Sequence, residues 1–283
     1  MTDEIDFLTE SIKNKLKTFN SLSKNDQIKE RNDFINKHSD ILSKHIGYFN
    51  GKKLKSTFWW DLVFTTEEII IAHRNETICK FSFSEEGVST PKQFDLIGKI
   101  IINKKFDQNG LFRVNSTKQR LRTANSLLQD IIEERVNEEK GLELFNKNFD
   151  LIDCCELYKV LLRSFNTTII PNTFINIILK INEIEDENNK KICTKAMYYA
   201  LPNNNRMILE SNVMLCYRIC VKTSTMTNAD KQMDLDGMSI VMMPNLFLMK
   251  DQDIEIERVL DLVEFCKYFY RIFPEICKVD INE

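Results

Sequence analysis

The chain contains few of the residues that interrupt helices. Of its 283 residues, only seven are glycine and five are proline. Strand-rich folds with many tight turns use both types often, because glycine adopts positive φ angles and proline fixes φ in turns. Their scarcity argues against a β-sandwich or a barrel. It favours helices that are joined by short loops.

Histidine is scarce too, and the cysteines lack the spacing of a zinc knuckle. Three histidines accompany eight cysteines, and no two cysteines stand in a Cys-x-x-Cys pair. A zinc site usually needs such pairs. Cys216 and Cys220 are one helical turn apart in the apolar run "VMLCYRICV". We therefore interpret the cysteines as reduced core residues in a reducing compartment.

Charge of one sign is not in excess, and long apolar runs are missing. The formal net charge is -3, so nothing draws the whole chain to nucleic acid or to an anionic membrane. The run "MTDEIDFLTESIKNK" has acids where a signal peptide has basic residues, and no apolar stretch reaches the length of a bilayer span. We expect a cytoplasmic protein without a nucleic-acid partner or an integral membrane segment.

Helical periodicity dominates residues 90–275. The run "STPKQFDLIGKIIINKKF" predicts a helix with Thr90 as its N-cap and Pro91 at its first position. The polar residues 115–117 mark the N-cap of the next helix. Six further segments have the same period, so this region is predicted to be all-α.

The first ninety residues have a different pattern. Near-heptad spacing is typical of a helical hairpin or of a short coiled coil, through which two chains could dimerise. The apolar residues with this spacing are Ile5, Leu8, Ile12, Leu16 and Phe19.

Alternation near residues 66–84 predicts a small β-hairpin around Arg74 and Asn75. We therefore divide the chain into an N-terminal extension, residues 1–79, and a helical domain, residues 80–283. The domain is expected to fold without the extension.

Several polar residues within the helical region are conspicuous. Arg113 lies in a loop, "GLFRVNSTKQR", and Lys159 and Arg163 are four residues apart on one helix face. Each position taken alone has an ordinary explanation. Lys159 and Arg163 would form a solvated face, Asn205 would cap a helix, and Asn245 would follow a helix that ends at a proline.

Together these positions resemble the signature of a known family. The chain contains, in order, "GLFRV", "YKVLLRSF", "LPNNNRMIL" and "SIVMMPNLF". This set resembles the RhoGAP domain, the helical GTPase-activating domain for Rho-family small GTPases. The resemblance covers roughly residues 80–275. It implies a RhoGAP-like helical bundle preceded by a helical N-terminal extension.

The resemblance also implies roles for four residues. Arg113 would be an arginine finger, which stabilises charge on the transferring phosphoryl group and accelerates hydrolysis by roughly 10³–10⁵-fold. Lys159, Arg163 and Asn245 would contact the switch regions of the GTPase or brace the finger loop, with Lys159 and Asn245 serving mainly in docking. The partner would be a Rho-family GTPase in its GTP-bound state, and it could recruit the protein to membranes. It would supply Mg²⁺, GTP and the water-positioning glutamine, so the chain would need no cofactor and would not itself be an enzyme.

Some positions depart from the family pattern. The turn after the lysine–arginine helix reads "SFNTT" in place of a leucine-proline-glutamate-proline turn, and Asn109 stands where a glutamate usually precedes the glycine. These changes bear on affinity and partner choice. A second hypothesis is therefore a GTPase-binding or scaffold module with a RhoGAP fold and little or no catalytic effect. A helical interaction protein unrelated to GTPases would require all four motifs to be coincidental.

Overall fold

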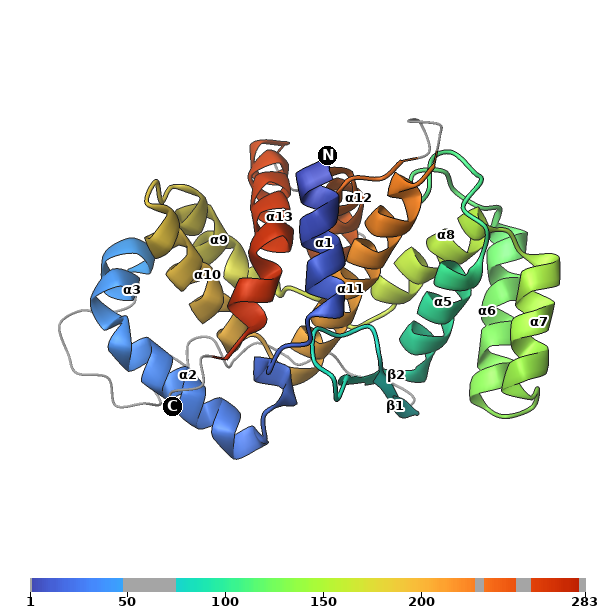
Figure 1. The fold of residues 1–283 in the computed structure, drawn as a ribbon, viewed down its shortest axis with the longest axis horizontal. Coiled ribbons are helices and arrows are strands. Elements are labelled where there is room, and N and C mark those ends of the chain that lie inside the picture. Colours follow the sequence, from blue (N-terminus) through green and yellow to red (C-terminus); the bar gives the residue numbers. More distant parts are fainter. Residues whose placement is uncertain (1, 48–74, 227–231, 248–255, 280–283) are drawn as a thin grey trace.

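The computed structural model describes residues 2–47, 75–226, 232–247 and 256–279, and helices dominate them (Figure 1). The α-helices are α1 (Thr2–Lys13), α2 (Lys24–Lys37), α3 (Ser39–Ile46), α5 (Lys92–Asn103), α6 (Lys118–Ile132), α7 (Glu138–Asn148), α8 (Leu151–Leu162), α9 (Ile175–Asn182), α10 (Glu187–Ala200), α11 (Asn203–Ser224), α12 (Leu235–Phe247) and α13 (Ile256–Cys277). Two short 3₁₀ helices, η1 (Phe19–Ser21) and η2 (Asn172–Phe174), accompany them. The predicted all-α class is confirmed.

The helices form three neighbouring groups along the long axis of the molecule (Figure 1). Helices α5 to α8 lie at one end, and α2, α3, α9 and α10 lie at the other. Helices α1, α11, α12 and α13 fill the middle, where α11 packs against α1, α5 and α12. One hydrophobic cluster runs through all three groups. None of the helices in the described part of the chain combines the length and the apolar character needed to cross a membrane.

The only strands among the described residues form one hairpin. Strand β1 (Glu76–Cys79) pairs with β2 (Val88–Pro91) in antiparallel register, with Glu76 opposite Pro91. The turn of this hairpin spans residues 80–87, enters the core and hydrogen bonds to the buried carboxylate of Glu210. The predicted turn around Arg74 and Asn75 stays a prediction, because residues 48–74 lie outside the described residues.

The helix around residue 92 starts later than predicted. Thr90 belongs to β2, Pro91 occupies the N-cap position, and α5 begins at Lys92 without a side-chain capping bond. Strand β2 continues through Pro91, so Thr90 lies one residue before the N-cap position and does not cap the helix. The next helix, α6, begins where predicted, because Thr117 caps it by accepting a hydrogen bond from the N–H of Arg120 at 3.3 Å.

The N-terminal residues pack into the core of their own chain. Helix α1 lies along α11, and it ends at Lys13, so the near-heptad positions Leu16 and Phe19 lie beyond it. The near-heptad stretch is therefore not one continuous helix, and the described part of the extension is helical. Five large apolar side chains of residues 2–47 are fully buried or nearly so: Leu8, Phe19, Ile35, Leu42 and Ile46. Dimerisation through this region stays a prediction.

The extension also meets the C-terminal end of the chain. Thr18 forms an isolated antiparallel bridge with Lys278, and the N–H of Val279 donates to the Lys17 carbonyl at 3.0 Å. The ammonium of Lys195 in α10 donates to the Lys278 carbonyl at 2.8 Å. The segment after α1 is therefore attached to the residues that follow α13, and Lys195 attaches those residues to α10. The division at residue 80 stays a prediction.

All eight cysteines are buried, and none forms a disulfide. Burial raises the pKa of each of their thiols, as for Cys154, where the pKa rises to about 12. A thiol of such high pKa remains protonated at neutral pH and is a poor nucleophile or metal ligand. Their interpretation as core residues is confirmed.

Candidate functional site

Arg113 projects from a tight turn between α5 and α6. The N–H groups of Arg113 and Val114 both donate to the Gly110 carbonyl at 2.9 Å. The turn requires left-handed backbone at Gly110, with φ +74°, and at Phe112, with φ +61°. Glycine adopts this region freely, whereas a non-glycine residue there costs on the order of 1–3 kcal/mol. The fold must therefore hold Phe112 in place.

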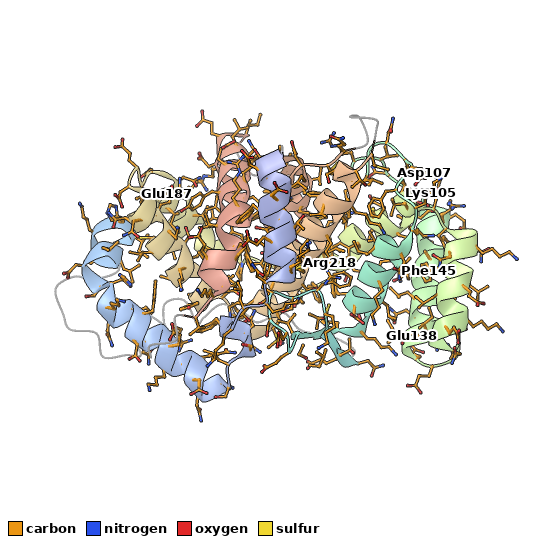
Figure 2. All side chains as sticks on the ribbon, viewed as in Figure 1. Lys105, Asp107, Glu138, Phe145, Glu187 and Arg218 are labelled. Carbon is orange, nitrogen blue, oxygen red and sulfur yellow. The ribbon has the colours of Figure 1, made fainter. Side chains whose placement is uncertain are left out.

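Two apolar side chains anchor this turn. Leu111 is 1% exposed and Phe112 is 2% exposed, while the next residue, Arg113, is exposed to solvent. Figure 2 shows the start of the loop, marked by Lys105 and Asp107, at the opposite end of α7 from Glu138. The turn thus buries its first two side chains and directs the arginine outward from a fixed base.

Lys159 holds the backbone of the turn from below. Its ammonium donates to the Phe112 carbonyl at 2.5 Å and forms an ion pair with Glu156 at 2.6 Å. Lys159 and Glu156 are both buried, so the interpretation of Lys159 as part of a solvated face is wrong. Lys159 turns inward because helix α8 packs directly beneath the loop. Its contact is with the residue that has the strained backbone.

Arg163 joins the same group from the end of α8. Its guanidinium donates to Glu156 at 3.1 Å and to the Lys159 carbonyl at 3.3 Å. Glu156 therefore faces two cations, one buried and one partly exposed. Phe112, Glu156, Lys159 and Arg163 together are called the finger network below.

A second carboxylate braces the loop where α6 begins. Asp153 accepts hydrogen bonds from Arg120 Nε at 3.0 Å and from the Ser116 hydroxyl at 2.5 Å. It also accepts from the Asp150 N–H at 2.9 Å and so completes the capping box of α8. Burial acts to raise the pKa of Asp153, but the bonds from Arg120 and Ser116 outweigh it and hold the pKa below its usual value. The start of α6 is thereby tied to the start of α8.

The first turn of α12 lies beside the guanidinium of Arg113. A Cβ atom placed on Gly237 would be 3.2 Å from Arg113 Nη2 and 2.8 Å from Asp234 Oδ1. Any side chain at position 237 would therefore press on both groups. The small residue lets the arginine pass close to the helix backbone.

Asn245 lies on the same helix, eight residues after Gly237 and so about 12 Å along it at 1.5 Å per residue. It is 5% exposed, and its amide donates to the Val241 carbonyl at 2.9 Å within α12. The expectation that Pro244 ends this helix is wrong, because α12 continues to Phe247 with Pro244 inside it. Packing against α8, α11 and α13 stabilises the helix despite the proline.

The fourth motif residue that was singled out, Asn205, is not a helix cap. Pro202 occupies the N-cap position of α11, and Asn205 is buried inside the helix. Its amide donates to the Ile169 carbonyl at 2.9 Å. Asn205 therefore fixes the chain that follows α8, at the turn where this sequence departs from the family pattern.

Comparison with known proteins places this geometry in a family. A model of the RhoGAP domain matches residues 91–251, which is more than half of the chain. The chain belongs to the RhoGAP family. The matched segment contains the finger turn, the finger network and α12.

Forty chains of solved structures match this RhoGAP chain, two of which are described here, and the search of curated proteins found no match. The crystal structure of human Rho GTPase activating protein 15 aligns with 17% identity and a TM-score of 0.51, over 66% of this chain and 83% of that one. The BH domain from Graf, the GTPase regulator associated with focal adhesion kinase, aligns with 15% identity and a TM-score of 0.49, over 65% of this chain and 94% of that one. At such identities the first similarity supports the shared fold.

Membership of the RhoGAP family implies regulation of Rho-family small GTPases by a protein that is not itself a GTPase. The structure brings the Arg113 turn, Lys159 and Arg163 into one place and puts Asn245 on the neighbouring helix α12. Their roles stay predictions. Sequence reasoning missed Glu156 and Asp153, although Glu156 lies three residues before Lys159 on the same face of α8 and Asp153 lies three residues before Glu156.

Proposed function

We propose that this RhoGAP domain accelerates GTP hydrolysis by a Rho-family small GTPase, with Arg113 as the arginine finger. The observation that carries the proposal is the setting of Arg113. It is exposed at the tip of a turn whose base is buried and whose backbone is held by the Lys159 ammonium. An arginine on a rigid support can be placed against a phosphate of the partner without further ordering.

The chemistry of this finger is electrostatic. Negative charge spreads over the transferring phosphoryl group as GTP is hydrolysed, and a planar guanidinium offers a permanent positive charge with two donors in fork geometry. The GTPase would supply GTP, Mg²⁺ and the glutamine that orients water. Lys159, Glu156 and Arg163 would keep the turn in position, and Asn245 would take part in docking from α12. We further propose that the protein acts in the cytoplasm and reaches membranes through its GTPase.

The alternative is a domain that binds the GTPase without accelerating hydrolysis. The altered turn after α8 favours this alternative, because a proline-rich turn at that place would be more rigid. The turn lies next to Ile169, whose carbonyl accepts the hydrogen bond from Asn205. The two hypotheses differ in the rate of GTP hydrolysis that they predict when the GTPase is saturated with this protein.

The test is single-turnover GTP hydrolysis by a panel of Rho-family GTPases, with the parent and its variants at saturating concentration. We expect Arg113→Ala to remove most of the acceleration, a loss of roughly 10³-fold or more, and to spare much of the binding to the GTP state. Arg113→Lys should recover little, because an ammonium cannot offer the same fork.

Arg122→Ala is the matched control, since Arg122 is also an exposed arginine and lies on α6. This variant should accelerate GTP hydrolysis by the GTPase as the parent does. If Arg113→Ala accelerates hydrolysis as well as the parent, the finger assignment fails. If the parent binds a GTPase and accelerates none in the panel, the binding module is the better description.

A further inference from the structure

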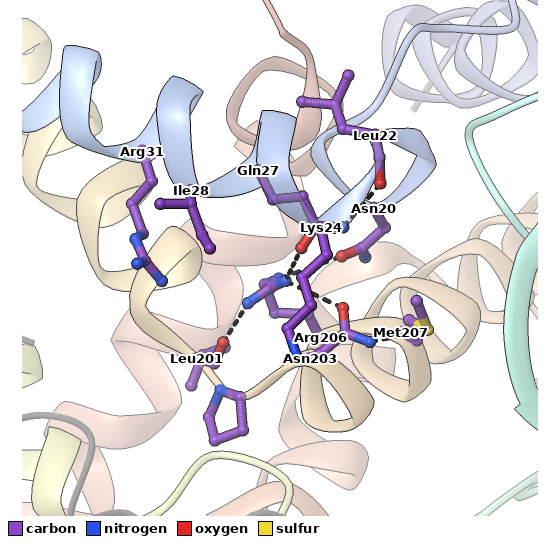
Figure 3. A pocket seen from close by; sticks show the side chains of 11 residues that line it. Asn20, Leu22, Lys24, Gln27, Ile28, Arg31, Leu201, Asn203, Arg206 and Met207 are labelled. Atoms are coloured by element: carbon purple, nitrogen blue, oxygen red, sulfur yellow. Dashed lines mark hydrogen bonds between the residues drawn. The ribbon is translucent and has the colours of Figure 1, made fainter.

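A pocket lies between the extension and the start of α11, and no residue of the finger turn lines it. It has a volume of about 670 Å³, which falls in the range of roughly 300–1,000 Å³ typical of small-molecule sites. Its walls come from η1 and α2 on one side and from residues 201–207 on the other (Figure 3).

The charge of this pocket is one-sided. Lys24, Arg31 and Arg206 line it, and none of the described residues that line it is acidic. Lys24 and Arg31 are seven residues apart on α2 and so share one face of the helix. Figure 3 shows both side chains extending from α2 toward the segment that begins α11. Burial and the positive charge of Arg206 lower the pKa of Arg31 to about 10.

Arg206 forms the floor and is fixed by neutral oxygens. Its guanidinium donates to the side-chain oxygens of Asn20 at 3.1 Å, Gln27 at 2.7 Å and Asn203 at 3.1 Å, and also to the Leu201 carbonyl. The residue is 4% exposed. These contacts orient the guanidinium at the base of the pocket.

The amino end of α11 adds to this positive potential. Pro202 and Asn203 line the pocket at the first turn of this 22-residue helix, and Pro202 provides no side-chain cap. The amino end of a helix carries about half a positive charge and favours anions. Three cationic side chains and a helix terminus thus converge on one cavity.

We propose that this pocket binds a small polyanion with several phosphate groups, of the kind found in free inositol polyphosphates and in phosphoinositide headgroups. Guanidinium groups match phosphate oxygens in geometry, and three separate cations match several phosphates better than one. The cavity is large enough for a phosphorylated ring. Such a ligand would contact α2 and α11 together and so bind the extension to the RhoGAP segment.

The test uses the full chain and inositol hexakisphosphate as the probe, with binding measured by isothermal titration calorimetry. The double variant Lys24→Gln/Arg31→Gln should weaken binding by about tenfold or more, because hydrogen bonds between charged groups are the strong ones. Lys29→Gln/Lys37→Gln is the control, since these lysines are on the same helix and do not line the pocket. It should bind as the parent does.

A pair of single substitutions, less disruptive than the double variant, guards against misfolding. Lys24→Gln and Lys29→Gln each remove one exposed lysine from α2, and only the first should weaken the probe, by about threefold or more. The probe should also raise the melting temperature of the parent, as any ligand specific for the native state does. The proposal is overturned if the probe does not bind, or if control and pocket variants lose affinity equally.

Vesicles distinguish the two sources of the ligand. Phosphatidylcholine vesicles are compared with the same vesicles containing phosphatidylinositol 4,5-bisphosphate in a flotation assay. Binding that needs the phosphoinositide, falls in Lys24→Gln and is displaced by inositol hexakisphosphate would assign a lipid headgroup. Binding of the soluble probe without any vesicle binding would assign a free inositol polyphosphate.

Discussion

Two buried carboxylates of this RhoGAP chain are stabilised in different ways. Asp153, beside the finger turn, faces the guanidinium of Arg120 directly. Glu210, in α11 beneath the extension, accepts from neutral donors: the Ser82 hydroxyl at 2.5 Å, the Phe83 N–H at 3.1 Å and the Asn20 amide at 2.9 Å. The pKa of Asp153 lies below its ordinary value, whereas burial raises the pKa of Glu210 above its own.

The difference follows from where each group sits. Around Glu210 the amide of Asn20 lies between the carboxylate and Arg206, and it donates to the first and accepts from the second. This arrangement joins the extension to α11 by hydrogen bonds that need no direct ion pair. The finger network instead uses direct ion pairs at Glu156. Direct ion pairs hold the Arg113 turn, whereas hydrogen bonds without a direct ion pair join Asn20 of the extension to Glu210 and Arg206 of α11.

Removing the extension should have the largest effect. A fragment of residues 48–283 lacks five buried apolar side chains, each worth about 1.5–3 kcal/mol. Their sum approaches the whole stability of an ordinary domain, about 5–15 kcal/mol. The sequence predicted that residues 80–283 would fold alone, and the packing leads us to expect the opposite. Circular dichroism should show no cooperative melting for either fragment, and a sharp transition near that of the parent would contradict this.

Lys159→Met should damage the finger network in both activity and stability. It removes the donor to the Phe112 carbonyl and one cation from Glu156, and breaking a buried ion pair costs about 3–5 kcal/mol. A displaced turn should also lower GTPase acceleration by about 10²-fold. Urea denaturation and single-turnover hydrolysis measure the two effects.

Arg163→Met is the matched control, because Arg163 is more exposed and leaves Lys159 on Glu156. Its loss of stability should be clearly smaller. Equal losses in the two variants would mean that the Phe112 contact adds nothing. A stable Lys159→Met protein that only binds its GTPase less well would restore the docking role that the sequence predicted.

Asp153→Asn should destabilise the protein at neutral pH by about 1.5–3 kcal/mol, the range for hydrogen bonds to a charged group. The folded pKa of Asp153 lies below its unfolded value. Its contribution is therefore present above the unfolded pKa of about 3.9 and is lost as pH falls through the folded pKa. Urea denaturation at neutral and acid pH should show the parent and variant converging in acid. An exposed carboxylate variant, Asp107→Asn, should change stability little at any pH.

Glu210→Gln should have the smallest effect and the opposite dependence on pH. Because the folded pKa is raised, the carboxyl contributes stability below its unfolded pKa of about 4.3, and this stability is lost as pH rises through the folded pKa. The glutamine variant lacks this loss, so it should gain on the parent as pH increases. A constant difference between the two proteins from pH 4 to 8 would show that Glu210 is not perturbed as described.

Local sequence patterns correctly predicted those features of the fold that depend on neighbouring residues. The Thr117 cap, the buried pair before Arg113 and the helical class all depend on neighbours within one or two turns. Thr90 was misassigned because it belongs to β2, which pairs with β1, and Pro244 because α12 is stabilised by packing that overrides its proline. Asp153 escaped notice because its partners Ser116 and Arg120 lie more than 30 residues before it in the chain. Glu156 escaped notice because it became relevant only once the structure placed Lys159 of α8 beneath the finger turn.

The sequence by itself determined the helical class, the family and the arginine at position 113, because periodicity and ordered motifs are properties of the chain alone. Only the tertiary structure decided that Lys159 points inward to the Phe112 carbonyl and that Phe112 has a left-handed backbone. It alone brought α2 against the start of α11, where Lys24 and Arg31 share one cavity with Arg206 from a distant part of the chain. The physical reason is that burial and long-range contact set the partner of each polar group, and neither is encoded in the spacing of neighbours.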